Sequence, residues 1–286
     1  MKGIAAILLV LLGLHGARAS REANLPDPAA FMKTVRDVAR LDYEIQSEFT
    51  YLERRRDIRL SKLGKVTVGP LRTFEVYPSP IRGRTYKRLI AVDGQPLDPA
   101  ELARRDAERA RVLREAEEKR RNETPGAREA RLQEEAEERR EREAVLDDAL
   151  AVFEVKFLRR EVIEGQPLLI GTATPRPHVR VSTREGRWLK QFAGEIRVSE
   201  TDHQIVRLDM RALDDVSIGW GIVGRVHKGS RFVFARRKIE NAWLPSEVTF
   251  DATGRTLLFR RFHIATTTTF SDYQRADPGD RAGRGR

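Results

Sequence analysis

Apolar and polar residues alternate in short runs along most of the chain, which is the pattern of β-strands with one buried face. The alternation is clear at Phe49–Tyr51 and again at Phe153–Phe157. Turn signals such as Asp93-Gly94 separate the runs. The predicted strands begin near residues 44, 66, 86, 153, 168, 188, 194, 204, 230, 246 and 256. Short links between so many strands predict a mainly antiparallel meander.

Two regions have helical periodicity instead. Asp27-Pro28 forms a helix start, and the residues after it place one apolar stripe on a helix, namely Phe31, Val35, Val38 and Leu41. Such a stripe needs a sheet to cover. The fold class is therefore α+β, mainly antiparallel β.

The second helical region is Asp98–Leu150, which is nearly all charge and Ala and lies between strand-like segments. Asp98-Pro99 starts one helix, Asn122–Gly126 interrupts it, and Thr124 with Pro125 can start another. We expect a charged helical hairpin inserted into the sheet, although one kinked rod stays open. Because large apolar residues cluster at the two ends, these ends should pack on the body. The sequence lacks sustained heptads, so it does not predict a long coiled coil.

The segment Val216–Gly224 is apolar and rich in glycine. It fits either a bent strand in the core or a mobile apolar flap that touches a membrane. The tail, Arg275–Arg286, is rich in Asp, Gly and Arg, and we expect it to be disordered.

Residues 1–19 have the features of a secretory signal peptide: a basic start, an apolar run from Ile4 to Leu14, and Ala17-Arg18-Ala19 as cleavage site. The mature chain is then expected to be a soluble protein of the periplasm. Its β domain comprises residues 20–97 and 151–274, which flank the insertion at residues 98–150. The chain has no Cys, so disulfides and thiolate metal sites are excluded.

The chain has a net charge of +11, but the insertion contains 17 acidic and 13 basic residues. The β body therefore carries the excess of positive charge. Such a body can contact anionic lipid headgroups or acidic polypeptides, and export makes nucleic acid an unlikely partner.

Recognisable catalytic motifs are absent from the sequence. The four histidines of the mature chain, His178, His203, His227 and His263, lie on different predicted elements. No HExxH pair, nucleophile elbow or phosphate-binding loop is present. We expect a protein that is not an enzyme and that needs no cofactor or metal.

Three stretches resemble the exported lipoprotein-carrier superfamily, which includes LolA- and LolB-like outer-membrane lipoprotein-sorting proteins and RseB-like sensors. They are Gln46–Tyr51, Ile90–Gln95, and Gly194–Val198 with the strand Ile205–Leu208. The resemblance covers residues 27–92 and 151–273. It implies a strongly curved meander sheet, an unclosed half-barrel, whose inner side is plugged by helices and binds acyl chains.

On this basis we expect a non-catalytic periplasmic carrier for lipoprotein acyl chains or lipid, with transient contact to a membrane surface. An alternative is an envelope sensor or assembly protein that binds a protein partner through the insertion. The side chains expected to bind lipid are the large apolar ones on one face of the strands and in the apolar segment: Phe49, Tyr51, Phe74, Val76, Trp220, Ile222, Phe232, Phe234 and Phe250.

Overall fold

The structure is a computed structural model that describes residues 25–42, 45–60, 66–78, 85–218, 224–256 and 260–276. The expected signal peptide, Trp220, Ile222 and residues 277–286 of the expected tail lie outside these ranges. Arg275 and Ala276 are described, at the end of the last strand.

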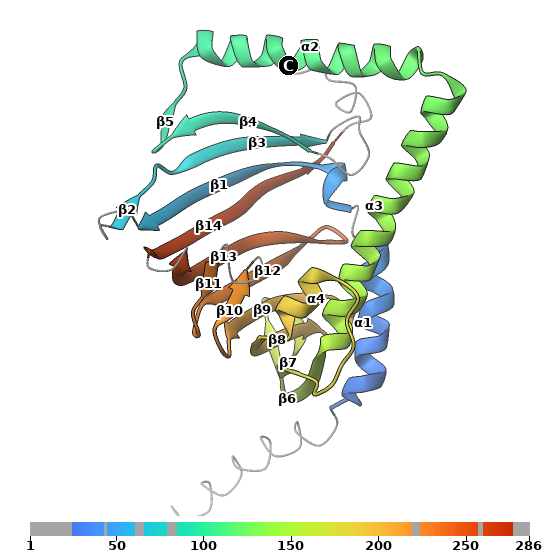
Figure 1. Cartoon of the computed structure of the whole chain (residues 1–286), viewed down its shortest axis with the longest axis vertical. Helices are drawn as coiled ribbons and strands as arrows, with labels where there is room; N and C mark the ends of the chain where they lie inside the picture. Colours follow the sequence, from blue (N-terminus) through green and yellow to red (C-terminus); the bar gives the residue numbers. More distant parts are fainter. Residues whose placement is uncertain are drawn as a thin grey trace, which may run out of the picture.

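The described chain forms one antiparallel sheet that does not close into a barrel (Figure 1). Its strands are β1 (Phe49–Leu60), β2 (Val66–Val68), β3 (Arg72–Pro78), β4 (Thr85–Val92), β5 (Gln95–Pro96), β6 (Phe153–Ile163), β7 (Gln166–Pro175), β8 (Phe192–Ser199), β9 (Ile205–Ala212), β10 (Val216–Ile218), β11 (Gly224–Val226), β12 (Arg231–Ile239), β13 (Ala242–Thr256) and β14 (Arg260–Arg275). The mainly antiparallel fold predicted from the sequence is confirmed.

The order of the strands differs from a simple meander. It runs β5-β4-β3-β1-β14-β13-β12-β9-β8-β7-β6, so the first strand pairs with the last. Strands β5 and β6 form the opposite edges of the open sheet, and the insertion between them in the sequence connects one edge to the other.

The insertion consists of α2 (Pro99–Arg121) and α3 (Pro125–Val152). Their caps are those that the sequence predicts: the side chain of Asp98 accepts hydrogen bonds from Ala100 N and Glu101 N, and that of Thr124 from Ala127 N. The helices meet at a corner instead of lying side by side, as Figure 1 shows. The insertion is therefore an open corner of two helices and not the expected hairpin, because its two ends connect to different edges of the sheet.

Helix α2 runs along β4, because the two-residue strand β5 pairs only with the end of β4 and leaves the rest of its outer side unpaired. Arg88 of β4 donates two hydrogen bonds of 2.7 Å to the Asp106 carboxylate of α2. The guanidinium of Arg109 lies 4.0 Å from the centre of the Tyr86 ring. The space between helix and strand is lined from both faces of β4, by Tyr86 and by Leu89. The helix therefore covers an edge that would otherwise offer unpaired backbone groups to another chain.

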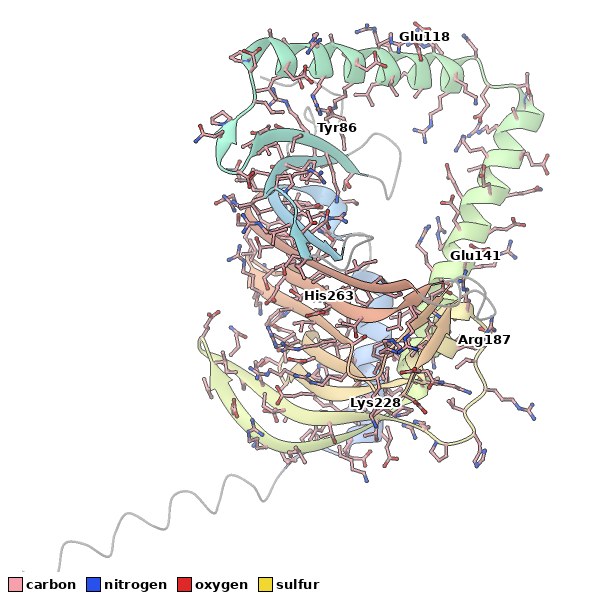
Figure 2. The ribbon with its side chains drawn as sticks, turned by 60° about the vertical axis from the view of Figure 1, so that its left-hand side comes forward. Tyr86, Glu118, Glu141, Arg187, Lys228 and His263 are labelled. Atoms are coloured by element: carbon pink, nitrogen blue, oxygen red, sulfur yellow. The ribbon has the colours of Figure 1, made fainter. Side chains whose placement is uncertain are left out.

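Helix α1 (Pro28–Asp42) covers the other half of the sheet, over β6–β9. Phe31 and Val35, from the predicted stripe, are buried against Val155, Leu169 and Ile196. We call the sheet face that α1 covers the inner face; the strands curve around it (Figure 2).

The sequence predicted a strand at residues 188–192, but the structure has the short helix α4 (Arg184–Leu189) there, followed by β8. Helix α4 begins because the side chain of Thr183 accepts a hydrogen bond from Gly186 N. The prediction was wrong because the alternation of Trp188 with polar neighbours also fits one helical turn.

The close approach of β8 and β9 at Gly194 yields a test. A Cβ at Gly194 would lie 1.9 Å from the carbonyl oxygen of Asp209, whereas a Cβ at Gly126 in α3 would meet nothing within 4 Å. We expect Gly194→Ala to lower the free energy of unfolding by about 1–3 kcal/mol, and the matched Gly126→Ala to raise it by about 0.5–1 kcal/mol. Urea unfolding of both variants measures this. Equal stability of the two would contradict the predicted packing.

Candidate functional site

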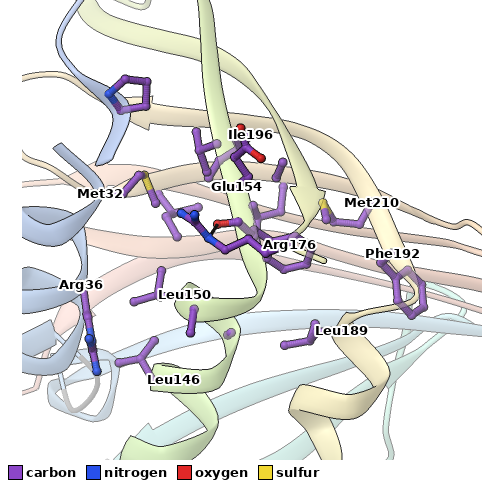
Figure 3. Close-up of a pocket in the computed structure, with 18 of the residues that line it drawn as sticks. Met32, Arg36, Leu146, Leu150, Glu154, Arg176, Leu189, Phe192, Ile196 and Met210 are labelled. Atoms are coloured by element: carbon purple, nitrogen blue, oxygen red, sulfur yellow. Dashed lines mark hydrogen bonds between the residues drawn. The ribbon is translucent and has the colours of Figure 1, made fainter. Parts of the chain in front are cut away.

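Three helices roof a hollow of about 920 Å³ over the inner face. Each helix contributes residues spaced three or four apart, which lie on one side of a helix. Helix α1 contributes Met32 and Arg36, α3 contributes Leu146, Ala149 and Leu150, and α4 contributes Glu185, Trp188 and Leu189. Figure 3 shows Leu146, Leu150 and Leu189 around the hollow.

The floor of the hollow is formed by neighbouring strands. Met210 of β9 pairs with Phe232 of β12, which pairs with Phe250 of β13, so these three side chains form a row on the inner face. The rest of the floor is the same face of β6–β9: Phe153, Val155, Ala173, Phe192, Ile196, Ile205 and Leu208. The walls are thus almost wholly apolar, as in pockets that bind small apolar ligands.

Charged side chains lie at the rim. Arg36 of α1 forms an ion pair of 2.9 Å with Asp147 of α3, which links the two roof helices. Arg176, just after β7, donates from Nε to the carbonyl oxygen of Phe153 at 3.2 Å. In Figure 3 its side chain extends across the hollow toward Met32.

A buried carboxylate holds α4 in the roof. Asp148 of α3 accepts hydrogen bonds from the backbone N–H groups of Ser182, at 2.9 Å, and Thr183, at 2.6 Å, and from the Thr183 hydroxyl at 2.7 Å. A Cβ on Gly186 would lie 2.5 Å from the same carboxylate, so only glycine leaves the space that Asp148 occupies. The start of α4 is therefore built around one side chain of α3.

These contacts set the charge state of Asp148. Burial alone would raise the pKa of its carboxyl, but the hydrogen bonds from Thr183 and Ser182 outweigh burial and leave the pKa below its usual value. Since the folded pKa is depressed, the stabilisation is present above the pKa of an unfolded Asp and is lost as the pH falls through the folded pKa.

The residues expected to bind lipid fall into four groups. Phe232 and Phe250 line the hollow. Phe234 lies two residues after Phe232 on β12, so both are on the same face of the sheet. It pairs with Leu208 of β9 and Val248 of β13. The positions outside the described ranges are Trp220 and Ile222.

The other four expected residues, Phe49, Tyr51, Phe74 and Val76, lie in a second core cluster over β1 and β3. This half of the inner face is filled by the chain itself: Phe49 is fully buried, and the rings of Tyr51 and Tyr273 are 4.9 Å apart. Burial, and then the nearby Glu53 carboxylate, raises the pKa of Tyr51 to about 12. The inner face is thus packed at β1–β3 and hollow at β6–β9.

Sequence reasoning missed the residues of the roof. The signals were present in the stripe that holds Phe31 and Val35 and in the apolar end of the insertion at Leu146 and Leu150. These signals did not show that α1, α3 and α4 meet over one half of the sheet. Met32 and Trp188 could not be assigned without that arrangement.

Groups suited to metal binding or catalysis are few. Among the described residues, no cluster of three His, Asp or Glu side chains could hold a metal ion. His203 lies in a turn and stacks on Phe31 at 4.6 Å between ring centres. None of the helices in the described ranges has the length and hydropathy needed to cross a bilayer.

The anchoring role of Asp148 can be tested against its neighbour. We expect Asp148→Ala to lower the free energy of unfolding by about 2–3 kcal/mol, because it leaves the N–H groups of Ser182 and Thr183 and the Thr183 hydroxyl without their charged acceptor. The control Asp147→Ala removes a partly exposed ion pair and should cost less than about 1 kcal/mol.

The measurement is chemical unfolding at several pH values. With Asp148→Asn, the stability difference from the parent protein should be constant at neutral pH and shrink in acid, because the parent loses the carboxylate there. A difference that grows as the pH falls would contradict this assignment.

Comparison with known proteins adds structural likenesses only. No family model matches the chain, and no curated protein matches it. A DUF1329 family protein from Desulfovibrio piger has 10% identity and a TM-score of 0.29, over 88% of this chain and 95% of its own. A LolA superfamily protein from Nitrosomonas europaea has 8% identity and a TM-score of 0.27, over 89% and 97%.

A chain in the MucA/MucB complex from Pseudomonas aeruginosa has 9% identity and a TM-score of 0.21, over 87% of this chain and 97% of its own. The superfamily that the sequence resembles is thus represented among the similar structures. None of these likenesses is strong enough to assign the chain to a family.

Proposed function

We propose that the protein is a non-catalytic carrier or binding protein for an acyl chain, either of a lipid or of a lipoprotein. The single observation that supports this is the hollow of about 920 Å³ between the roof helices and the inner face. Protein interiors are otherwise packed with few voids larger than a water molecule. An apolar space of this size is therefore suited to a ligand.

The chemistry of the walls favours a chain of methylene groups. Burying one methylene contributes about 0.8 kcal/mol, so about ten of them contribute roughly 8 kcal/mol before the costs of association. The floor residues Ile196, Leu208 and Met210 offer no directional groups. Such walls bind by exclusion of water and tolerate chains of different length.

The start of the sequence supports a proposal for the place of action. Residues 1–19 have the composition of a signal peptide, so we propose that the protein works in the periplasm. A carrier there shields an acyl chain from water while it moves between membranes, and it contacts each membrane only transiently.

The direct test is extraction. Protein purified from membrane-containing cells should release a stoichiometric acyl species on solvent extraction, identified by mass spectrometry. Protein that yields no such species, and that binds no added amphiphile, would contradict the carrier proposal.

A substitution in the roof tests where the ligand lies. Ala149→Trp places a large side chain into the hollow from α3, whereas Ala136→Trp changes an exposed position of the same helix. We expect the first to weaken binding of dodecyl maltoside more than ten-fold, because displacing about two methylenes costs ~1.6 kcal/mol. The control should bind like the parent protein. Isothermal titration calorimetry measures both, and equal affinities would place the ligand elsewhere.

A second candidate function is binding of an envelope protein through the insertion. Leu132 favours it: this large apolar residue of α3 is 50% exposed, in a helix surrounded by charge. Removing the whole insertion cannot test this, because Leu146 and Ala149 roof the hollow.

Leu132→Glu is the suitable change. If the insertion binds a partner protein, the Leu132→Glu variant should no longer pull that partner down from envelope extracts. Its binding of dodecyl maltoside should stay at the parent value. Gln133→Glu, an exposed neighbour, is the control for added charge. If the Leu132→Glu variant retained every partner of the parent protein, the proposal that the insertion binds a partner through Leu132 would be contradicted.

A further inference from the structure

Within the part of the chain that the structure describes, two cations at the rim of the hollow have no carboxylate partner. Lys33 of α1 and Arg176 after β7 both line the hollow. Among the described residues neither forms an ion pair, and the contact of the Arg176 side chain is the one from Nε to the Phe153 carbonyl. That contact holds the stem of Arg176 while its two terminal nitrogens stay available.

Both cations belong to the lining of the same hollow. The side chain of Arg176 extends toward Met32 of α1, as Figure 3 shows, and Lys33 lines the hollow from the same helix. A guanidinium presents parallel donors to a carboxylate or phosphate, and an ammonium adds a charge with three donors. Together they form a place for one anionic group above an apolar space.

The other charges of the rim include three carboxylates. Asp27 keeps its negative charge and accepts a hydrogen bond of 2.8 Å from Ala30 N at the start of α1. Glu154 forms an ion pair of 3.5 Å with Lys156. Glu185 is the remaining carboxylate, and it belongs to α4. The rim near α1 therefore keeps an excess of positive charge.

We propose that the hollow selects anionic amphiphiles, in which an acyl chain fills the space and a phosphate or carboxylate head is bound by Lys33 and Arg176. This inference rests on the proposed function, since it names the class of ligand for the same site. It requires no chemistry beyond binding. The head would lie at the rim, where it stays partly hydrated, and the chain would lie under α3 and α4.

The experiment compares headgroups on one chain. Dodecyl phosphate, dodecanoate and dodecyl maltoside, each below its micelle concentration, are titrated into the full mature protein by isothermal titration calorimetry. We expect each anionic probe to bind about ten-fold more tightly than the maltoside, which is the value of one charge-assisted hydrogen bond. Inorganic phosphate alone should not bind measurably, because it lacks the chain. Comparing the first two probes shows which anionic head is favoured.

Variants assign the preference to residues. In Lys33→Gln/Arg176→Gln the ratio of phosphate to maltoside affinity should fall to about one. Arg180→Gln, a change at an exposed arginine of the same loop that does not line the hollow, should keep the parent ratio. The parent ratio should also fall with added salt, because screening weakens charge contacts at an exposed rim. The salt titration uses the parent protein alone, so its result does not depend on how a variant folds.

The outcomes separate this inference from the proposed function. If all three probes bind the parent protein equally, selection by charge is overturned while the carrier proposal stands. If none binds, the carrier proposal itself is overturned. A preference that survives in the double variant would assign the anionic head to other residues and overturn the role of Lys33 and Arg176.

Discussion

A single curved sheet has an apolar inner face that another part of the chain must cover, because no second sheet lies against it in the described ranges. This requirement shapes the whole molecule. At β1 and β3 the sheet is covered by its own large side chains, with Tyr51 and Tyr273 in ring contact. At β6–β9 three helices cover it, and they leave a space of about 920 Å³ between themselves and the sheet. The hollow is what this incomplete cover leaves.

The insertion determines which half of the inner face is covered by helices. It begins at the β5 edge and ends at the β6 edge, so its two helices must bridge the open sheet. Arg88 and Asp106 tie α2 to one edge, and Asp148 ties the end of α3 to α4 at the other. The same charged segment that looks like a solvated arm in the sequence therefore closes an exposed strand edge and supplies part of the roof.

Polar contacts in this roof organise apolar ones. The carboxylate of Asp148 lies beside Gly186, which leaves the space for it, and sets the position of α4 over the sheet. Trp188 and Leu189 then face the hollow. These directional contacts fix α4 relative to α3, so the position of this part of the roof does not depend on apolar contacts alone.

Much of this protein follows from local pattern. Alternation predicted the strands, the stripe containing Phe31 and Val35 predicted α1, and Asp98 and Thr124 predicted the starts of α2 and α3, because these signals depend on residues a few positions apart. Phe232 and Phe250 could be proposed for the site since parity places them on one face.

The tertiary structure decided the rest. Pairing of β1 with β14, the corner between α2 and α3, and the helix at Arg184–Leu189 depend on residues far apart in sequence. So does the division of the inner face into a packed half, with Phe49 and Val76, and a hollow half. Whether an apolar side chain fills space or borders it depends on what lies opposite, and opposite residues here come from segments far apart in the sequence.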